Sequence, residues 1–235
     1  MRKIVILALV AIPIIVILTF PVSVALPWLG APDALGQVRG TAWSGSARWS
    51  QPGHAPMNLA WRWGGARHWN WRAGDGNTNL TGRWQAGNDM ILHDLSGRLD
   101  LARVDIAYWL MGSRPTGYLE LDIPSARLVA GEVPQLTGQV IWEDARLEGA
   151  IHESLGRILI ELEPGATQQL ARVTSMEPGA VEVQGRIEAD AERYHADILL
   201  RASPDRPDVD YQLESLGERQ PDGQVRLRLS GALGW

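Results

Sequence analysis

The sequence predicts a mainly β protein: a single N-terminal transmembrane helix followed by a curved, mostly antiparallel β-sheet domain built of repeated hairpins. Three observations support this fold class. Residues 4–29 contain no charged side chain. From Gln37 onward, apolar and polar residues alternate with a period of two, which is typical of strands with one buried and one solvated face. Glycine and proline residues separate the alternating runs, as turns require.

The charge-free run from Ile4 to Leu29 is long enough to cross a membrane. A spanning helix needs about 20 predominantly apolar residues, because the hydrocarbon core of a bilayer is about 30 Å thick. Arg2 and Lys3 precede the run, and the next basic residue is Arg39. Positive charge on the short N-terminal side orients the N-terminus toward the cytoplasm. We therefore expect a single-pass anchor in a bacterial inner membrane, with the C-terminal domain in the periplasm.

A cleaved signal peptide is the alternative interpretation of this run. Signal peptides have an apolar region of about 7–15 residues that ends in a small-x-small cleavage site. The best candidate site here is Ser23-Val24-Ala25, which Pro27 follows two residues later. The apolar run exceeds the length of a signal peptide, which favours the retained anchor.

We expect three regions: residues 1–29 as cytoplasmic N-terminus and anchor, 30–36 as a linker, and 37–235 as one periplasmic β domain. The chain has no cysteine, so the domain depends on its core rather than on disulfides. Residues 1–115 carry eleven basic and six acidic side chains, a net charge of +5. Residues 116–235 carry eleven basic and twenty-one acidic side chains, a net charge of −10. Scattered arginines in an acidic chain argue against a nucleic-acid partner, which requires a basic stripe.

Three segments show the strand pattern most clearly. Apolar and polar residues alternate in Leu119–Ile123, in Val181–Asp190 and in Val225–Leu233. Antiparallel sheets have this alternation, whereas strands buried in a parallel sheet read as continuous apolar runs.

Turn signals lie between the expected strands. They include Gly64-Gly65, the repeated Glu-Pro-Gly at 163–165 and 177–179, and a break at 203–207. Proline followed by glycine suits the two central positions of a type II turn. We expect one short helix, at Leu101–Met111, where apolar residues could form one stripe.

A weak repeat places a glycine in phase with the apolar residues of several expected strands. A glycine on the core face of a strand usually marks a bend, a bulge or the close approach of a bulky group. We expect tryptophans on adjacent strands to cover such glycines. Chance recurrence of a common strand composition is the alternative. The glycines concerned are Gly82, Gly97, Gly138, Gly185 and Gly231.

The chain contains eleven tryptophans and a single phenylalanine, Phe20. Trp61 and Trp63 share a face of one expected strand, and Trp69 and Trp71 share a face of the next. The two segments form a hairpin with facing indoles. These four residues are the candidate surface for a partner or a ligand. Ordinary cross-strand packing is the alternative that we favour, because tryptophan is the bulky side chain available to this core.

No motif in the sequence indicates catalysis or a cofactor. The segment Asp75–Asn79 resembles the start of a calcium loop, but Leu80 and Ala86 replace the glycine and the glutamate that such a loop requires. The histidines lack the spacing of metal ligands, and Ser44 lacks a nucleophile motif. We expect no catalytic residue, no metal, no cofactor and no small-molecule substrate. The five histidines are His54, His68, His93, His152 and His195.

The segment Val38–Trp49 contains Val-Arg-Gly-Thr-Ala-Trp-Ser-Gly shortly after the expected anchor. In this it resembles the N protein of the bacterial type II secretion (general secretion pathway) machinery. Further matches follow in order along the chain, although the pair Trp69 and Trp71 is outside the family pattern. They are Leu59–Arg62, Leu80–Gly82, Leu136–Trp142 and Val225–Gly231.

The resemblance implies a non-enzymatic inner-membrane component with a structural or assembly role in protein secretion. Its implied partners are the other inner-membrane and periplasmic components of the apparatus, and no residue role carries over. The alternative function is periplasmic lipid handling. In that case an anchored, curved β-sheet would form a groove for acyl chains, as in bridge proteins of the AsmA kind.

Overall fold

A computed structural model describes residues 35–50, 54–87, 89–103, 114–129, 131–149 and 152–233. The expected membrane anchor at residues 4–29 lies outside these ranges. Within them, no helix combines the length and the hydrophobicity that crossing a membrane requires.

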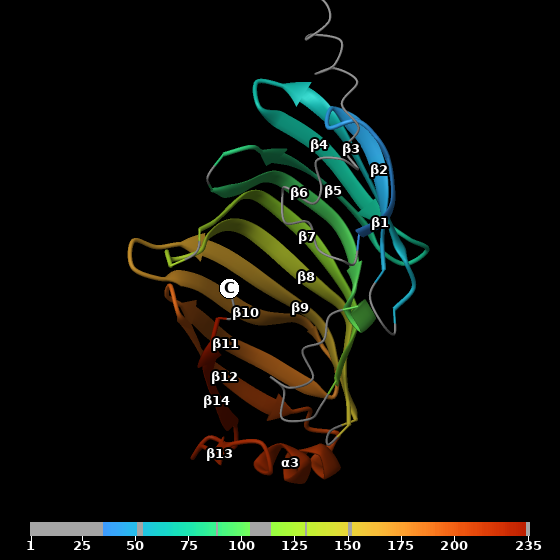
Figure 1. Cartoon of the computed structure of the whole chain (residues 1–235). Helices are drawn as coiled ribbons and strands as arrows, with labels where there is room; N and C mark the ends of the chain where they lie inside the picture. The colour runs from blue at the N-terminus through green and yellow to red at the C-terminus, as the bar shows by residue number, and fades with distance from the viewer. Residues whose placement is uncertain are drawn as a thin grey trace, which may run out of the picture. The chain divides into compact units, whose positions relative to one another are not determined.

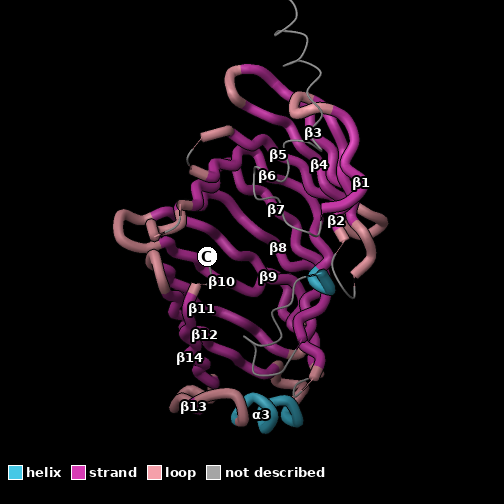
Figure 2. The backbone as a smooth tube through the Cα atoms, in the orientation of Figure 1, coloured by secondary structure: helices cyan, strands magenta, loops and turns pink. Residues whose placement is uncertain are grey.

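The described chain is mainly β, as the alternation predicts, and contains fourteen strands (Figure 1). The chain divides into two compact units between Trp84 and Gln85. Figure 2 shows how little of either unit is helical.

The first unit is an antiparallel meander in which each strand lies beside its neighbour in sequence. Tryptophan, valine and leucine at alternate positions suit a pleated, half-buried surface. The strands are β1 (Leu35–Gly40), β2 (Ser44–Trp49), β3 (Met57–Gly65), β4 (His68–Gly74) and β5 (Asn79–Gln85).

The turn between β3 and β4 differs from the predicted one. The sequence places it at Gly64-Gly65, but these glycines belong to the end of β3 and the turn is formed by Ala66 and Arg67. Both turn residues have positive φ, 45° and 66°. Two successive residues of this kind make the type I′ turn that matches the twist of a two-residue hairpin. The register shift at Gly65 provides the local irregularity that moves the turn.

The second unit is also an antiparallel sheet, in the order β6-β7-β8-β9-β10-β11-β12-β14-β13. The ribbons of this unit curve (Figure 1). The strands predicted at Leu119–Ile123, Val181–Asp190 and Val225–Leu233 are confirmed as parts of β7, β11 and β14. The strands are β6 (Met90–Asp100), β7 (Arg114–Leu128), β8 (Gln135–Glu148), β9 (Glu153–Pro164), β10 (Gln169–Pro178), β11 (Val181–Ala189), β12 (Arg193–Ala202), β13 (Glu218–Arg219) and β14 (Val225–Ala232).

One connection breaks the strict neighbour order. After β12 the chain forms helix α3 (Pro207–Glu214) and the two-residue strand β13 before β14 returns to pair with β12. Helix α3 is absent from the sequence expectations, which treat 203–207 only as a break. Its signal is Pro207 at the first helical position with Asp208 and Asp210 in the first turn, where acidic side chains favour the positive end of the helix dipole.

Helix α3 covers part of the apolar face of the second unit. Val209 is fully buried and Leu213 is 2% exposed. Both belong to a cluster with fully buried Val181 and Val225 of the sheet. Burying such side chains is worth about 1.5–3 kcal/mol each, so the helix is held by its contact face rather than by its length.

The predicted helix at Leu101–Met111 begins with one 3₁₀ turn, η2 (Leu101–Arg103). Leu101 in this turn is buried, and the Asp100 carboxylate accepts a hydrogen bond from the Ala102 N–H. Residues 104–113, which hold the rest of the expected helix, lie outside the described ranges.

The side chain of Gln169 extends the hydrogen-bonding of the second sheet beyond the end of β9. It is 5% exposed and reaches from β10 to Leu136 on β8. Its Oε1 accepts from the Leu136 N–H at 2.7 Å, and its Nε2 donates to the Leu136 carbonyl at 3.0 Å. The amide therefore substitutes for a peptide group where β9 stops at Pro164.

We predict that replacing Gln169 with alanine lowers the free energy of unfolding by about 1–3 kcal/mol, because both backbone groups of Leu136 lose their partner. Q169E keeps the shape but loses the N–H donor, so it should destabilise as well. Urea unfolding followed by circular dichroism measures both. Gln168, which is half-buried, supplies the control Q168A. Equal stability of Q169E and the natural protein would contradict this role.

Candidate functional site

The four tryptophans predicted to face one another do so. Trp61 lies opposite Trp71, and Trp63 lies opposite Trp69, in the register of the β3–β4 hairpin. Residues directly opposite in an antiparallel pair share a face. The two strands therefore bring all four indoles to one side of the first unit.

Two further tryptophans join them. The Trp43 ring lies 5.5 Å from the Trp63 ring, edge to face, and 6.3 Å from the Trp69 ring, stacked. The Trp84 ring of β5 lies 5.4 Å from the Trp69 ring. Aromatic pairs at these separations are worth about 0.5–1.5 kcal/mol beyond the area that they bury. We call these six residues the tryptophan cluster: Trp43, Trp61, Trp63, Trp69, Trp71 and Trp84.

The sequence analysis missed Trp43 and Trp84 as members. The position of Trp84 was available from the sequence, because it is two residues from Gly82 and so shares that glycine's face. Trp43 lies in the turn between β1 and β2, where alternation gives no face, so its position depends on the turn conformation.

Hydrogen bonds from two indoles fix this turn. Trp61 Nε1 donates to the Thr41 carbonyl at 3.1 Å, and Trp69 Nε1 donates to the Ala42 carbonyl at 2.9 Å. Trp71 Nε1 is buried and has no hydrogen-bond partner among the described residues. An unsatisfied buried donor costs about 1–3 kcal/mol. The contribution of Trp71 to stability therefore comes from the packing of its ring and not from its N–H group.

Indoles lie over two strand glycines: Gly82, where the expectation is confirmed, and Gly45, which was not among the glycines expected to be covered. A Cβ added to Gly82 would lie 3.0 Å from the Trp71 ring. A Cβ on Gly45 would overlap the Trp61 ring. The rule extends to Gly231, which lies under Tyr194, but not to Gly138 or Gly185, where backbone atoms approach instead.

The tryptophan cluster is partly core and partly surface. Trp61, Trp69 and Trp71 are half-buried. Trp63 is 48% exposed and Trp84 is 41% exposed. Large exposed apolar side chains that gather in one place are typical of interaction sites. The cluster therefore packs in part against its own sheet and presents in part an apolar surface to the solvent.

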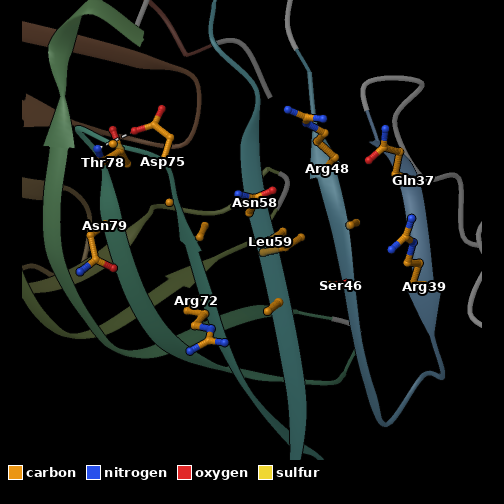
Figure 3. Close-up of a pocket in the computed structure, with 15 residues that line it drawn as sticks. Gln37, Arg39, Ser46, Arg48, Asn58, Leu59, Arg72, Asp75, Thr78 and Asn79 are labelled. Atoms are coloured by element: carbon orange, nitrogen blue, oxygen red, sulfur yellow. Dashed lines mark hydrogen bonds between the residues drawn. The ribbon is translucent and has the colours of Figure 1, made fainter.

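The opposite face of the first unit is polar and cationic. An open pocket of about 750 Å³ lies over β1 to β4, and its lining includes Arg39, Arg48, Arg72 and Asn58 (Figure 3). The turn after β4 closes one end of the pocket. There the Asp75 Oδ1 accepts hydrogen bonds from the N–H groups of Asn77 and Thr78, at 2.8 and 2.7 Å. Residues 75–78 therefore form a polar turn that side-chain hydrogen bonds hold in place.

The second unit holds an apolar cavity of about 220 Å³ that the sequence did not reveal. Strands β8 to β12 and β14 supply its walls, and Leu213 and Leu216 at α3 contribute to one side. Every lining side chain is apolar. They are Trp142, Leu147, Leu155, Ile158, Ile160, Val173, Val181, Val183, Ile187, Ala196, Ile198, Leu200, Leu213, Leu216, Leu227 and Leu229.

The polar face of the second unit differs from that of the first, because most of its arginines are paired with carboxylates. Arg226 Nε donates to Asp197 Oδ1 at 2.7 Å, and this hydrogen bond lowers the pKa of the Asp197 carboxyl. Arg206 bridges Glu153 of β9 and Asp208 of α3, each at 2.9 Å. Arginines with an ion pair in this unit are Arg127, Arg157, Arg172, Arg186, Arg201, Arg206, Arg219, Arg226 and Arg228.

Possible metal ligands do not gather within the described ranges, where no group of three histidine, aspartate or glutamate side chains could hold an ion. The ring of His93, for example, lies beside an amide and not beside other candidate ligands: its Nε2 is 3.3 Å from Gln85 Oε1.

A comparison with protein families finds one matching model, described as type II secretion system (T2SS), protein N, over residues 31–228. Neither the curated proteins nor the solved structures include a significant match.

We predict that W61A or W71A lowers the free energy of unfolding by about 3–5 kcal/mol, as for large aromatic residues removed from a core. W63A should cost less, because nearly half of that ring is exposed. Thermal unfolding of the full chain in neutral detergent, followed by circular dichroism, ranks the three. Equal losses at Trp61 and Trp63 would contradict the division into core and surface.

A matched pair of phenylalanine variants supplies the control. W61F removes an N–H that donates to Thr41, whereas W71F removes one that has no partner among the described residues. Both lose the same ring atoms. W61F should therefore be the less stable of the two by about 1 kcal/mol.

Proposed function

Because this chain belongs to the type II secretion system protein N family, we propose that it is a single-span component of the bacterial inner membrane with a structural or assembly role in that apparatus. The family match carries the proposal. In this role the protein acts by binding other inner-membrane and periplasmic components, not by catalysis.

The proposed topology rests on the sequence that precedes the described ranges. Residues 4–29 hold no charge, and Arg2 and Lys3 lie on their N-terminal side. With that run in the membrane, the β domain is periplasmic and begins within a few residues of the bilayer. This places its first unit where other membrane-anchored components can reach it.

We propose that the exposed part of the tryptophan cluster contacts a partner component. Trp63 and Trp84 both present more than two fifths of their surface to solvent. The other cluster members hold these rings in place through stacking. Tryptophan is enriched at the energetic centres of protein interfaces, because a rigid ring buries a large area at little entropic cost. The partner surface is therefore an apolar one.

We predict that W63A/W84A impairs secretion while leaving most of the domain's stability intact. The variant is expressed in cells whose own copy of the gene is deleted, and exported enzymes are measured in the medium. W63F/W84F keeps the aromatic contact and should restore secretion. M176A/Y211A removes two exposed apolar side chains of the second unit and should leave secretion unchanged.

Two outcomes would contradict this proposal. Normal secretion after deletion of the gene would remove the role in the apparatus. Normal secretion by W63A/W84A, with impaired secretion in the deletion strain, would contradict only the proposal that these tryptophans contact a partner.

A second candidate function, lipid handling, is favoured by the apolar cavity of the second unit. Its volume of about 220 Å³ is below the roughly 300–1,000 Å³ of sites for drug-sized ligands. It suits a single hydrocarbon chain rather than a whole lipid. An apolar cavity that excludes water can bind an apolar guest in this way.

We predict that, if this second function holds, native mass spectrometry of the full chain detects a lipid adduct that I187W abolishes. Ile187 lines the cavity, and an indole there would fill it. Glu188 is the next residue of β11 and points to the opposite face, so E188W is the matched control and should keep the adduct. A chain without any adduct, or an adduct that survives I187W, would exclude the cavity as a lipid site.

A further inference from the structure

Four arginines share one face of the first unit, one from each of four adjacent strands. Arg39 of β1 lies opposite Ser46 of β2, and Ser46 lies opposite Ala60 of β3, which lies opposite Arg72 of β4. Arg48 and Arg62 are two residues from Ser46 and Ala60, and so occupy the same face. We call Arg39, Arg48, Arg62 and Arg72 the arginine face.

Among the described residues, the arginine face has no internal counter-charge. All four side chains are exposed, and within the described ranges none forms an ion pair. The acidic side chain of this unit in those ranges is Asp75, whose carboxylate already accepts two backbone hydrogen bonds in the turn after β4. Four positive charges therefore face the solvent together.

Most arginines of the second unit, in contrast, are paired with carboxylates. Nine of its arginines have a carboxylate within 4.0 Å, among them Arg157 with Glu143 at 2.6 Å. Acidic residues were thus available to this sequence, and the first unit lacks them where arginines lie side by side. Like charges on neighbouring strands repel one another, so an external anion would stabilise the arginine face.

The geometry of the face suits a surface of many phosphates rather than one small anion. Adjacent strands are about 4.8 Å apart, so the four guanidinium groups extend across a width of three strand spacings. The pocket that Arg39, Arg48 and Arg72 line is open (Figure 3). A guanidinium group binds phosphate with two parallel hydrogen bonds.

We propose that the arginine face binds the anionic phospholipid headgroups of the membrane next to which the domain lies. This inference rests on the proposed anchor. The charge-free run ends at Leu29 and β1 begins at Leu35. The five residues between them span at most about 18 Å when fully extended. The arginine face is therefore tethered close to a layer of phosphates, which favours lipid over a distant acidic protein.

The experiment uses a single introduced cysteine, because the natural sequence has none. Ser46 is exposed on the arginine face. The full-length S46C chain carries a fluorophore at this position and is reconstituted in nanodiscs whose lipids bear a headgroup quencher. The nanodiscs contain phosphatidylcholine, either alone or mixed with phosphatidylglycerol.

We predict stronger quenching when phosphatidylglycerol is present. The increase should vanish at 1 M salt, where the Debye length falls to about 3 Å. Each arginine replaced by glutamine should weaken binding to the anionic surface about fivefold. R39Q/R48Q/R62Q/R72Q should therefore lose the increase, and replacing the same four residues with lysine should keep much of it.

The matched control removes the same charge from the second unit, as R172Q/R186Q/R201Q/R228Q, and should quench like the natural chain. Melting curves show whether the variants fold. Equal quenching with and without phosphatidylglycerol would overturn the inference. Protection of the fluorophore by an acidic peptide, and not by anionic lipid, would overturn it as well.

A separate experiment shows whether the proposed anchor exists, because a carbonate wash releases a chain without an anchor from membranes. The labelled chain is then mixed with preformed phosphatidylglycerol vesicles that carry the quencher. Quenching that depends on the four arginines would support the arginine face without the anchor. No quenching would overturn it.

Discussion

Each unit of this protein depends on covering one apolar face of an antiparallel sheet. A sheet that buries neither face has too little apolar contact to offset the entropy of ordering its strands. The second unit meets this requirement with its curvature and with α3, whose Val209 and Leu213 pack on the sheet. The first unit contains no helix in its described part. Its tryptophans cover their own sheet by lying flat over strand glycines. The same constraint thus explains both the tryptophan content and the recurring glycines.

Covering a sheet with its own side chains leaves an incomplete core. In the first unit the indoles at the edge of the cluster, Trp63 and Trp84, remain exposed. In the second unit the helix is too short to fill the curved face, and a cavity remains beside Leu213. Both candidate surfaces therefore arise from the same shortage of covering elements. A surface that folding leaves apolar is available for binding without further rearrangement.

Period-two alternation predicts the strands of this protein well, because each strand has one buried and one solvated face. It also brings Trp61, Trp63, Trp69 and Trp71 to one face correctly. Alternation does not locate features that depend on the chain leaving the strand conformation. The turn at Ala66 and Arg67 depends on backbone twist, and the helix α3 depends on capping signals in a polar segment. The apolar cavity depends on side chains from six strands and could not be read from any one of them.

The order of the strands has a consequence for how the chain reaches its folded state. Within each unit nearly every strand pairs with the strand next to it in sequence, and the exception is β12, which pairs with β14 instead of β13. Contacts between residues close in sequence form quickly, because little chain must be ordered to close each loop. Hairpins can then add one after another as successive segments of the chain become available. The edge strand exposed at each stage is covered by the next segment to appear, which shortens the time during which it could pair with another chain.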